Sequence, residues 1–97
     1  MSIEVRSTSA FDEWLKGLRD FTAKARVLTR IDRLSIGNAG DCRSVGEGVM
    51  EMRIHYGPGY RVYFVRQGET VVVLLAGGDK DSQARDIKKA IDLAKEL

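Results

Sequence analysis

Four side chains that could act on a phosphate lie close together around one turn of the sequence. Arg53 and His55 precede a Gly-Pro-Gly turn at 57–59, and Arg61 and Tyr63 follow it. Because side chains alternate between the faces of a strand, a hairpin at this turn brings all four to one polar face. Arginine forks match phosphate oxygens, and histidine or tyrosine can exchange protons. We expect this face to be dominated by cations, which suits phosphoryl chemistry on a nucleic-acid backbone.

RNA is the substrate for which this set of residues is sufficient. Its own 2′-hydroxyl can act as the nucleophile, so the reaction needs a base, an acid and positive charge, but no metal. His55, or a lysine or tyrosine with an altered pKa, could transfer the protons. The same residues also fit a simpler interpretation, in which the arginines are solvated or pair with a neighbour such as Glu51. The residues alone leave both interpretations open.

The sequence lacks the signals of other chemistries. The glycines at 57–59 and 77–78 complete no dinucleotide or phosphate-loop motif, and no GxSxG elbow is present. One histidine and one cysteine, Cys42, offer no structural metal site and no internal disulfide. We therefore expect neither a cofactor nor a metal.

Three consecutive strands between Met50 and Asp79 should position the candidate site. Alternate residues from Met50 to Ile54 and from Tyr60 to Phe64 are apolar, which gives each of the first two strands one core face. The third strand, 71–76, is apolar on both faces, as expected of a strand covered on both sides. We expect a glycine-rich segment at 40–48 to form at most a short irregular strand.

The N-terminal half should supply an edge strand and two helices. Residues 2–7 alternate as a short strand, and Ser9 is the expected N-cap of a first helix. A second helix should end at about residue 36, before Gly37. Its expected buried stripe contains Phe21, Ala25, Leu28, Val27 and Leu34.

The second helix region also carries a basic stripe formed by Arg19, Arg26, Arg30 and Arg33. Their spacing gathers them within roughly 60° of one another around a helix. Such a stripe is either a solvated face or a surface that contacts phosphates, for which positive side chains in a row are sufficient. We expect a last helix with Asp79 as its N-cap, or with Ser82 one turn later, which brings Lys80 and Gln83 next to the polar sheet face.

The predicted order is β-α-α-β-β-β-α, an α+β fold with an antiparallel sheet, an N-terminal helix pair and a C-terminal helix. The 97 residues, with 43% hydrophobic and 31% charged side chains, predict a single domain spanning 1–97. No run of residues is long and apolar enough for a membrane span, and the N-terminus does not look like a secretion signal. We therefore expect a cytoplasmic protein with no membrane partner.

Several motifs together resemble one family. The stretch from Gly46 to Phe64, GEGVMEMRIHYGPGYRVYF, is similar to the signature of addiction-module killer proteins, a HigB-like, phage-related branch of the RelE/ParE toxin superfamily. FDEWL at 11–15, RIDRL at 30–34 followed by GNAGD at 37–41, and LLAGGDK at 74–80 resemble the same family. The resemblance covers nearly the whole chain.

The resemblance implies the toxin of a type II toxin–antitoxin system. RelE-like members are ribosome-dependent endoribonucleases that cut mRNA, and this branch is neutralised by a helix-turn-helix, HigA-like antitoxin. Carried onto this sequence, Arg53, Arg61 and Lys80 would stabilise the scissile phosphate, and His55 or Tyr63 would transfer protons. The stripe from Arg19 to Arg33, together with Gln83, would face RNA. The free toxin is expected to be a monomer.

The resemblance also leaves two alternatives open. ParE-like members of the same superfamily poison DNA gyrase without cutting RNA, and fold alone does not separate the two activities. An inactive relative could act only as an antitoxin-binding regulatory module. The C-terminal residues that several relatives use have no clear equivalent in the final AKEL of this chain.

Overall fold

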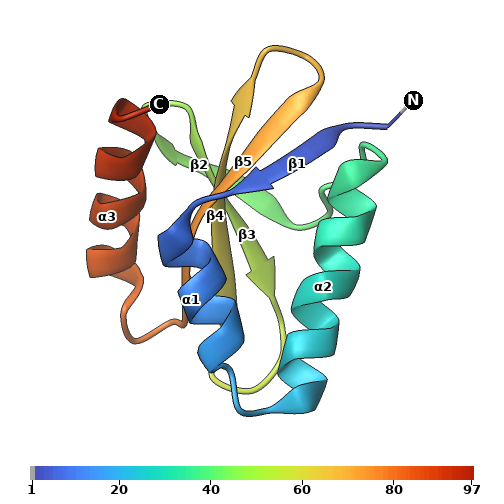
Figure 1. The fold of residues 1–97 in the computed structure, drawn as a ribbon. Coiled ribbons are helices and arrows are strands. Elements are labelled where there is room, and N and C mark those ends of the chain that lie inside the picture. The colour runs from blue at the N-terminus through green and yellow to red at the C-terminus, as the bar shows by residue number, and fades with distance from the viewer. Residues whose placement is uncertain (1) are drawn as a thin grey trace.

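A five-stranded sheet runs through the molecule and carries helices on both faces (Figure 1). The computed structural model describes residues 2–97. In chain order the elements are β1 (Glu4–Ser7), α1 (Ser9–Gly17), α2 (Phe21–Ser35), β2 (Cys42–Gly46), β3 (Val49–Ile54), β4 (Tyr60–Gln67), β5 (Val71–Gly78) and α3 (Gln83–Lys95). This arrangement confirms the predicted α+β class, with the helix pair before the main strands and one helix after them.

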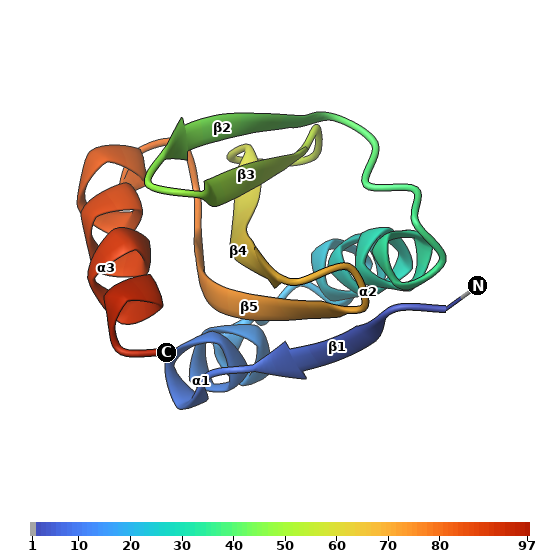
Figure 2. The same cartoon turned by 90° about the horizontal axis from the view of Figure 1, so that it is seen from above.

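The strands lie in the order β1-β5-β4-β3-β2, so β4 is central and β1 and β2 form the edges. The edge position predicted for the first strand is confirmed. The sheet is mixed rather than antiparallel, because β1 runs parallel to β5 while all other neighbours are antiparallel. Figure 2 shows β1 beside β5 at one edge and β2 at the other.

Strand β2 is an element that the predicted order lacks. It forms a hairpin with β3 through Glu47 and Gly48, whose φ angles are 52° and 81°. Positive φ at both residues is the geometry of a type I′ turn, the connection that matches the twist of a hairpin. The pairing shifts its register between Ser44 and Gly46. The glycine-rich segment therefore does contain a short irregular strand, which forms one arm of a hairpin.

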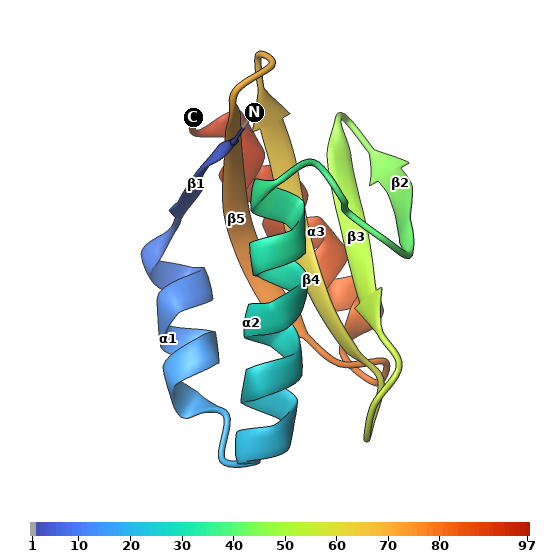
Figure 3. The same ribbon diagram turned by 90° about the vertical axis from the view of Figure 1, so that its right-hand side faces the viewer.

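The helices divide the apolar side chains into two cores, one on each side of the sheet. Figure 3 shows α1 and α2 together on one face and α3 on the other. The larger core lies under α1 and α2 and contains Phe11, Val27, Leu34, Met52, Ile54, Val62, Phe64, Val72 and Leu74. The smaller core lies under α3 and contains Val49, Tyr63, Val73, Leu75, Ala76 and Ala90. The alternation predicted for β3 and β4 is confirmed, since their even-numbered apolar residues enter the larger core.

The buried stripe of α2 agrees only partly with the predicted stripe. Ala23, Val27 and Leu34 are buried, whereas Phe21 is 84% exposed and Leu28 is 44% exposed. Residues 21 and 23 are about 200° apart around a helix, so they lie on opposite faces. Both faces carry apolar residues at helical spacing. Packing against the sheet determines that the face with Ala23 is the buried one. The prediction was wrong for Phe21, Ala25 and Leu28 for this reason, since all three are exposed.

Two predicted helix caps are also corrected. Thr8 rather than Ser9 caps α1, since its hydroxyl accepts a hydrogen bond from the N–H of Phe11 and donates one to the carbonyl oxygen of Leu75. Ser82, the alternative cap, precedes α3 in place of Asp79. Asp79 instead stabilises the turn before the helix, where its Oδ1 accepts from the backbone N–H groups of Asp81 and Ser82. None of the helices in residues 2–97 combines the length and the apolar character needed to cross a bilayer.

Candidate active site

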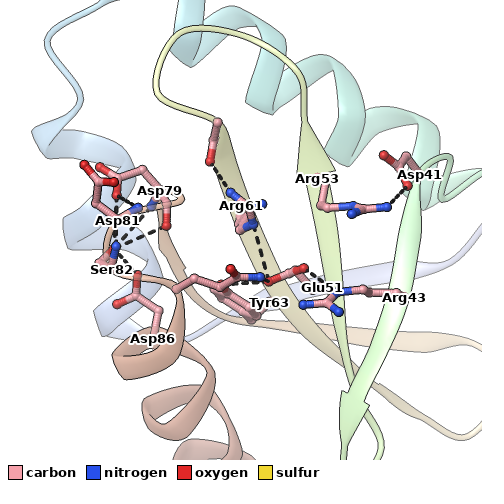
Figure 4. A network of polar contacts seen from close by, with 12 residues as sticks. Asp41, Arg43, Glu51, Arg53, Arg61, Tyr63, Asp79, Asp81, Ser82 and Asp86 are labelled. Atoms are coloured by element: carbon pink, nitrogen blue, oxygen red, sulfur yellow. Dashed lines mark hydrogen bonds and ion pairs between the residues drawn. The ribbon is translucent and has the colours of Figure 1, made fainter.

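The register of β3 and β4 brings the predicted residues together on the face of the sheet that α3 partly covers. Arg53 lies directly opposite Arg61, and Glu51 lies opposite Tyr63. Two arginines opposite each other repel, so their charges need compensation. Figure 4 shows how this is arranged, since Arg61 lies beside Glu51 while Arg53 extends toward Asp41, away from Arg61.

Glu51 is the centre of the polar contacts on this face and is fully buried. Its carboxylate accepts hydrogen bonds from Arg43 Nε at 2.9 Å, Tyr63 Oη at 3.1 Å and Gln83 Nε2 at 3.0 Å. Arg61 Nε lies 3.5 Å from Glu51 Oε2. A buried charge is tolerated only when it is paired and hydrogen-bonded, which these four partners achieve. Glu51 therefore ties together β2, β3, β4 and α3.

The contacts of Glu51 determine which groups on this face can exchange protons. Burial alone would raise the pKa of Glu51, but the hydrogen bonds from Arg43, Gln83 and Tyr63 outweigh it and hold the pKa below its usual value. Burial and the neighbouring Glu51 carboxylate hold the pKa of Tyr63 well above its usual range. Tyr63 is fully buried. Its hydroxyl therefore serves to hold Glu51 and is out of reach of a ligand in this structure.

Arg61 is held in place from two sides. Its Nη1 donates to the carbonyl oxygen of Gly59 at 2.8 Å, and its Nε faces Glu51. The side chain is 12% exposed, and its buried Nε makes no hydrogen bond within residues 2–97, although it lies within ion-pair distance of Glu51. Arg61 and Lys80 both lie beside Gly59. A Cβ at this position would lie 3.3 Å from Arg61 Nη1 and 3.5 Å from Lys80 Cβ. Lys80 therefore lies beside the same glycine as Arg61, in the turn before α3 and not in the helix itself.

Arg53 and His55 share one carboxylate, that of Asp41. Arg53 Nη2 donates to Asp41 Oδ1 at 3.1 Å, and His55 Nε2 lies 2.5 Å from Asp41 Oδ2. The hydrogen bonds from His55 and Arg53 hold the pKa of Asp41 below its usual value. Arg53 is half-exposed, whereas the His55 side chain is 75% exposed. His55 is therefore an oriented imidazole at the surface.

Two carboxylates of this face, Asp41 and Glu51, were not among the predicted site residues. The face expected to be dominated by cations carries Arg53, His55 and Arg61, and Glu51 and Asp41 lie at the centres of its two clusters, so the arginines are paired, which was the alternative that the residues left open. Glu51 was considered as a neighbour of the arginines, but its burial follows from α3 packing over β3 and β4, which no local pattern reveals. The turn at Glu47-Gly48 alone would align residue 42 with residue 53, and the register shift between Ser44 and Gly46 moves the alignment to residue 52, so the contacts of Asp41 did not follow from the turn.

The predicted basic stripe is divided among different environments, and Arg19 lies before the start of α2, so it is not on one helix with the other three arginines. Arg30 points inward and donates to the carbonyl oxygens of Arg53, Ala39 and Asp41. The guanidinium carbon of Arg26 lies 4.8 Å from the ring centroid of Tyr56, whose hydroxyl donates to Asp20. Arg19 and Arg33 are exposed. Gln83, the other predicted RNA contact, donates its side-chain N–H to Glu51.

The stripe and Arg61 lie on opposite faces of the sheet. Helix α2 covers the larger core, whereas Arg61 shares its face with Tyr63 of the smaller one. Arg30 connects the two faces around the β2–β3 edge through its contacts with Arg53 and Asp41.

Comparison with solved structures identifies the class of fold. The free E. coli toxin RelE, in the form of a double arginine-to-alanine mutant, superposes with a TM-score of 0.72 at 13% identity, covering 100% of this chain and 99% of RelE. The archaeal RelE–RelB complex from Pyrococcus horikoshii OT3 gives a TM-score of 0.61 at 18% identity, covering 82% and 97%. The RelBE2 toxin–antitoxin complex from Mycobacterium tuberculosis gives 0.55 at 20% identity, covering 82% and 100%. The chain therefore has the RelE-like fold.

Sequence comparison identifies the family within this fold. Residues 13–97 match the family described as "Phage derived protein Gp49-like (DUF891)". An uncharacterized protein of Haemophilus influenzae (strain Rd) is 50% identical over 97 residues, which cover 100% of this chain and 98% of that protein. The chain belongs to the Gp49-like family. The resemblance to the RelE/ParE superfamily is thereby confirmed, while the HigB-like branch stays a prediction.

Proposed function

We propose that this protein is the toxin of a type II toxin–antitoxin system and acts as a ribosome-dependent endoribonuclease that cleaves mRNA. The RelE-like fold supports the class, since the similar structures include a RelE toxin and two toxin–antitoxin complexes. The observation that carries the proposal is Arg61, a guanidinium fixed by Glu51 and Gly59 next to Lys80. A positive group that is already fixed in place stabilises developing charge without reorganising during the reaction.

The reaction that these residues support is attack by the RNA 2′-hydroxyl on the adjacent phosphate. The 2′-hydroxyl loses its proton, the 2′-oxygen bonds to phosphorus, and the bond to the 5′-oxygen breaks. The products are a 2′,3′-cyclic phosphate and a 5′-hydroxyl, and no metal takes part. Arg61 and Lys80 would neutralise the charge that develops on the phosphorane oxygens, with Arg53 at the neighbouring position of β3.

The exposed arginines of the helix pair would contact ribosomal RNA. Arg19 and Arg33 are exposed, and Arg26 stacks over Tyr56 at the turn that leads into β4. Contacts with phosphates are independent of sequence and need only accessible positive side chains. With Arg30 held by backbone carbonyls, Arg19, Arg26 and Arg33 form this surface. The activity requires a cytoplasmic location, where translating ribosomes are found.

The proposed partner is a co-encoded antitoxin, of the helix-turn-helix, HigA-like kind. Two of the similar structures are complexes of a RelE-type toxin with its antitoxin, which supports a partner of this class. A neutralising segment is expected to cover the face that carries Arg53 and Arg61 or to clamp the helix pair. A structure of the complex in which both surfaces stayed open would contradict neutralisation by steric blocking.

Induced expression in a bacterial host tests the proposal. The wild type should arrest growth and produce new message 5′ ends that depend on translation, and Arg61→Ala should do neither while keeping its fold. Arg66→Ala is the matched control, since Arg66 is an exposed arginine on the same strand. Growth arrest with intact messages would point to DNA gyrase, as in ParE-like proteins. The absence of arrest would point to an antitoxin-binding module.

A further inference from the structure

The Asp41 carboxylate joins the one histidine of the chain to an arginine of the candidate site. Its Oδ2 lies 2.5 Å from His55 Nε2, and its Oδ1 accepts from Arg53 Nη2 at 3.1 Å. These two are the charged side chains that face the carboxylate. His55 follows β3 and precedes the turn at 57–59, so Asp41 approaches it from the neighbouring chain segment that enters β2.

The backbone of Asp41 is fixed as firmly as its side chain. Its carbonyl oxygen accepts from the N–H of Arg53 at 2.9 Å and from Arg30 Nη2 at 3.4 Å. Arg30 Nη1 also donates to the carbonyl oxygen of Arg53 at 2.6 Å. The preceding Gly40 has a φ of 70°, and a Cβ there would lie 2.9 Å from Arg30 Nη2. The chain therefore reaches Asp41 through a conformation that favours glycine and leaves room for Arg30.

The contact decides which imidazole nitrogen carries the proton in neutral His55. A carboxylate only accepts hydrogen bonds, so the nitrogen that faces it must be the protonated one. That nitrogen is Nε2, which leaves Nδ1 unprotonated on a side chain that is 75% exposed. A carboxylate that fixes the tautomer and orientation of a histidine is the arrangement by which hydrolases prepare a general base.

We infer that Asp41 is a positioning residue, which holds His55 so that Nδ1 is the proton acceptor of the active site. The inference rests on the proposed endoribonuclease function and assigns the base within it. Nδ1 takes the proton of the RNA 2′-hydroxyl as the 2′-oxygen bonds to phosphorus. The 5′-oxygen leaves and takes a proton from water, and the resulting hydroxide accepts the proton held by His55.

The tautomer of His55 can be measured without any assay of activity. Because the chain has one histidine, its imidazole nitrogens give two unambiguous ¹⁵N signals. At about pH 8.5, where an ordinary histidine is neutral, the wild type should show a protonated Nε2 and an unprotonated Nδ1. Asp41→Asn offers an amide that can donate as well as accept, so the fraction with a protonated Nδ1 should rise. A wild type that already has its proton on Nδ1 would overturn the inference, whatever the variants do.

Cleavage of mRNA on translating ribosomes gives the second readout. His55→Ala should lose about 100-fold or more of the activity, as expected for removal of a general base, and Asp41→Asn at least about 10-fold because the base is misoriented. Asp92→Asn, the same change at an exposed position of α3, should cleave like the wild type. Unchanged cleavage by Asp41→Asn would overturn the inference, and increased cleavage would overturn it and make Asp41 a competitor of the substrate phosphate for Arg53.

The two proposals fail in different ways. If the wild type does not cleave mRNA, the endoribonuclease function and the role of His55 as its base both fall, while the ¹⁵N signals still decide whether Asp41 sets the tautomer. If the wild type cleaves but His55→Ala cleaves equally well, the function stands and the assignment of the base falls. Dispersed amide spectra of each variant show that its fold is intact.

Discussion

Glu51 shows how a single side chain links the stability of this protein to its candidate site. Its buried carboxylate is surrounded by Arg43, Arg61, Tyr63 and Gln83. Glu51→Gln keeps the shape but removes the charge, and it leaves two arginines without their partner. We expect a loss of about 3–5 kcal/mol in the free energy of unfolding at neutral pH, the range for breaking a buried ion pair. Urea denaturation measures it, with Glu69→Gln, an exposed change of the same kind, as the control.

The difference in unfolding free energy between the wild type and Glu51→Gln should be smaller in acid. The pKa of Glu51 is lowered in the folded state, so its stabilising contribution is complete above the pKa of the unfolded chain, about 4.3. The contribution is lost as the pH falls through the folded-state pKa. The difference in unfolding free energy between wild type and Glu51→Gln should therefore shrink steadily below about pH 4. A difference that stayed constant down to pH 2 would show that Glu51 stabilises the fold by packing and not by charge.

The residues that the sequence predicted correctly share one property. Arg53 and Arg61 were assigned to one face because alternation along a strand is a local rule, and β3 and β4 obey it. Asp41 and Glu51 gain their roles from contacts with other strands and with α3, and no local spacing encodes these contacts. Tyr63 was placed on the correct face, but its burial depends on the same packing.

Helix α2 illustrates what periodicity can and cannot decide about an element. Two leucines of this helix allow the effect of burial on stability to be compared, because Leu34 is fully buried and Leu28 is 44% exposed. Leu34→Ala should cost about 2–5 kcal/mol of unfolding free energy, as for other large-to-small changes in a core. Leu28→Ala should cost less than about 1 kcal/mol, since surface substitutions have small effects. Equal losses for the two variants in thermal or urea unfolding would mean that α2 is rotated from the orientation described.

The end of β5 passes close to α1 and needs a residue without a side chain. A Cβ on Gly77 would lie 2.2 Å from Trp14 Cε3, so Gly77→Ala must displace the indole from the larger core. We expect a loss of about 1–3 kcal/mol in unfolding free energy from this overpacking. Gly17→Ala is the matched control at the end of α1, where a Cβ would meet no atom within 4 Å and should be neutral or slightly stabilising. Equal stability of Gly77→Ala and wild type would contradict the close approach of Trp14.

For the molecule as a whole, the order of helices and strands was predicted better than the topology of the sheet. The order of helices and main strands was predictable because alternation and helical spacing are strong in this chain. The parallel pairing of β1 with β5 was not, because it depends on how the helix pair returns the chain across the sheet. The candidate site depends on both the local structure of the strands and the packing of distant segments. Strands position its arginines, while the segment before β2 supplies Asp41 to pair with Arg53, and α3 supplies Gln83 to hydrogen-bond Glu51.

The most direct test of the account uses purified protein with ribosomes that translate a defined message. The wild type should produce cuts that require translation, with 5′-hydroxyl and 2′,3′-cyclic phosphate ends, and Arg61→Ala should reduce the cleavage rate by about 100-fold or more. Arg66→Ala should retain the wild-type rate. Cleavage by Arg61→Ala at the wild-type rate, or no cleavage by the wild type on translating ribosomes, would contradict the central claim that this face of the sheet is a ribonuclease site.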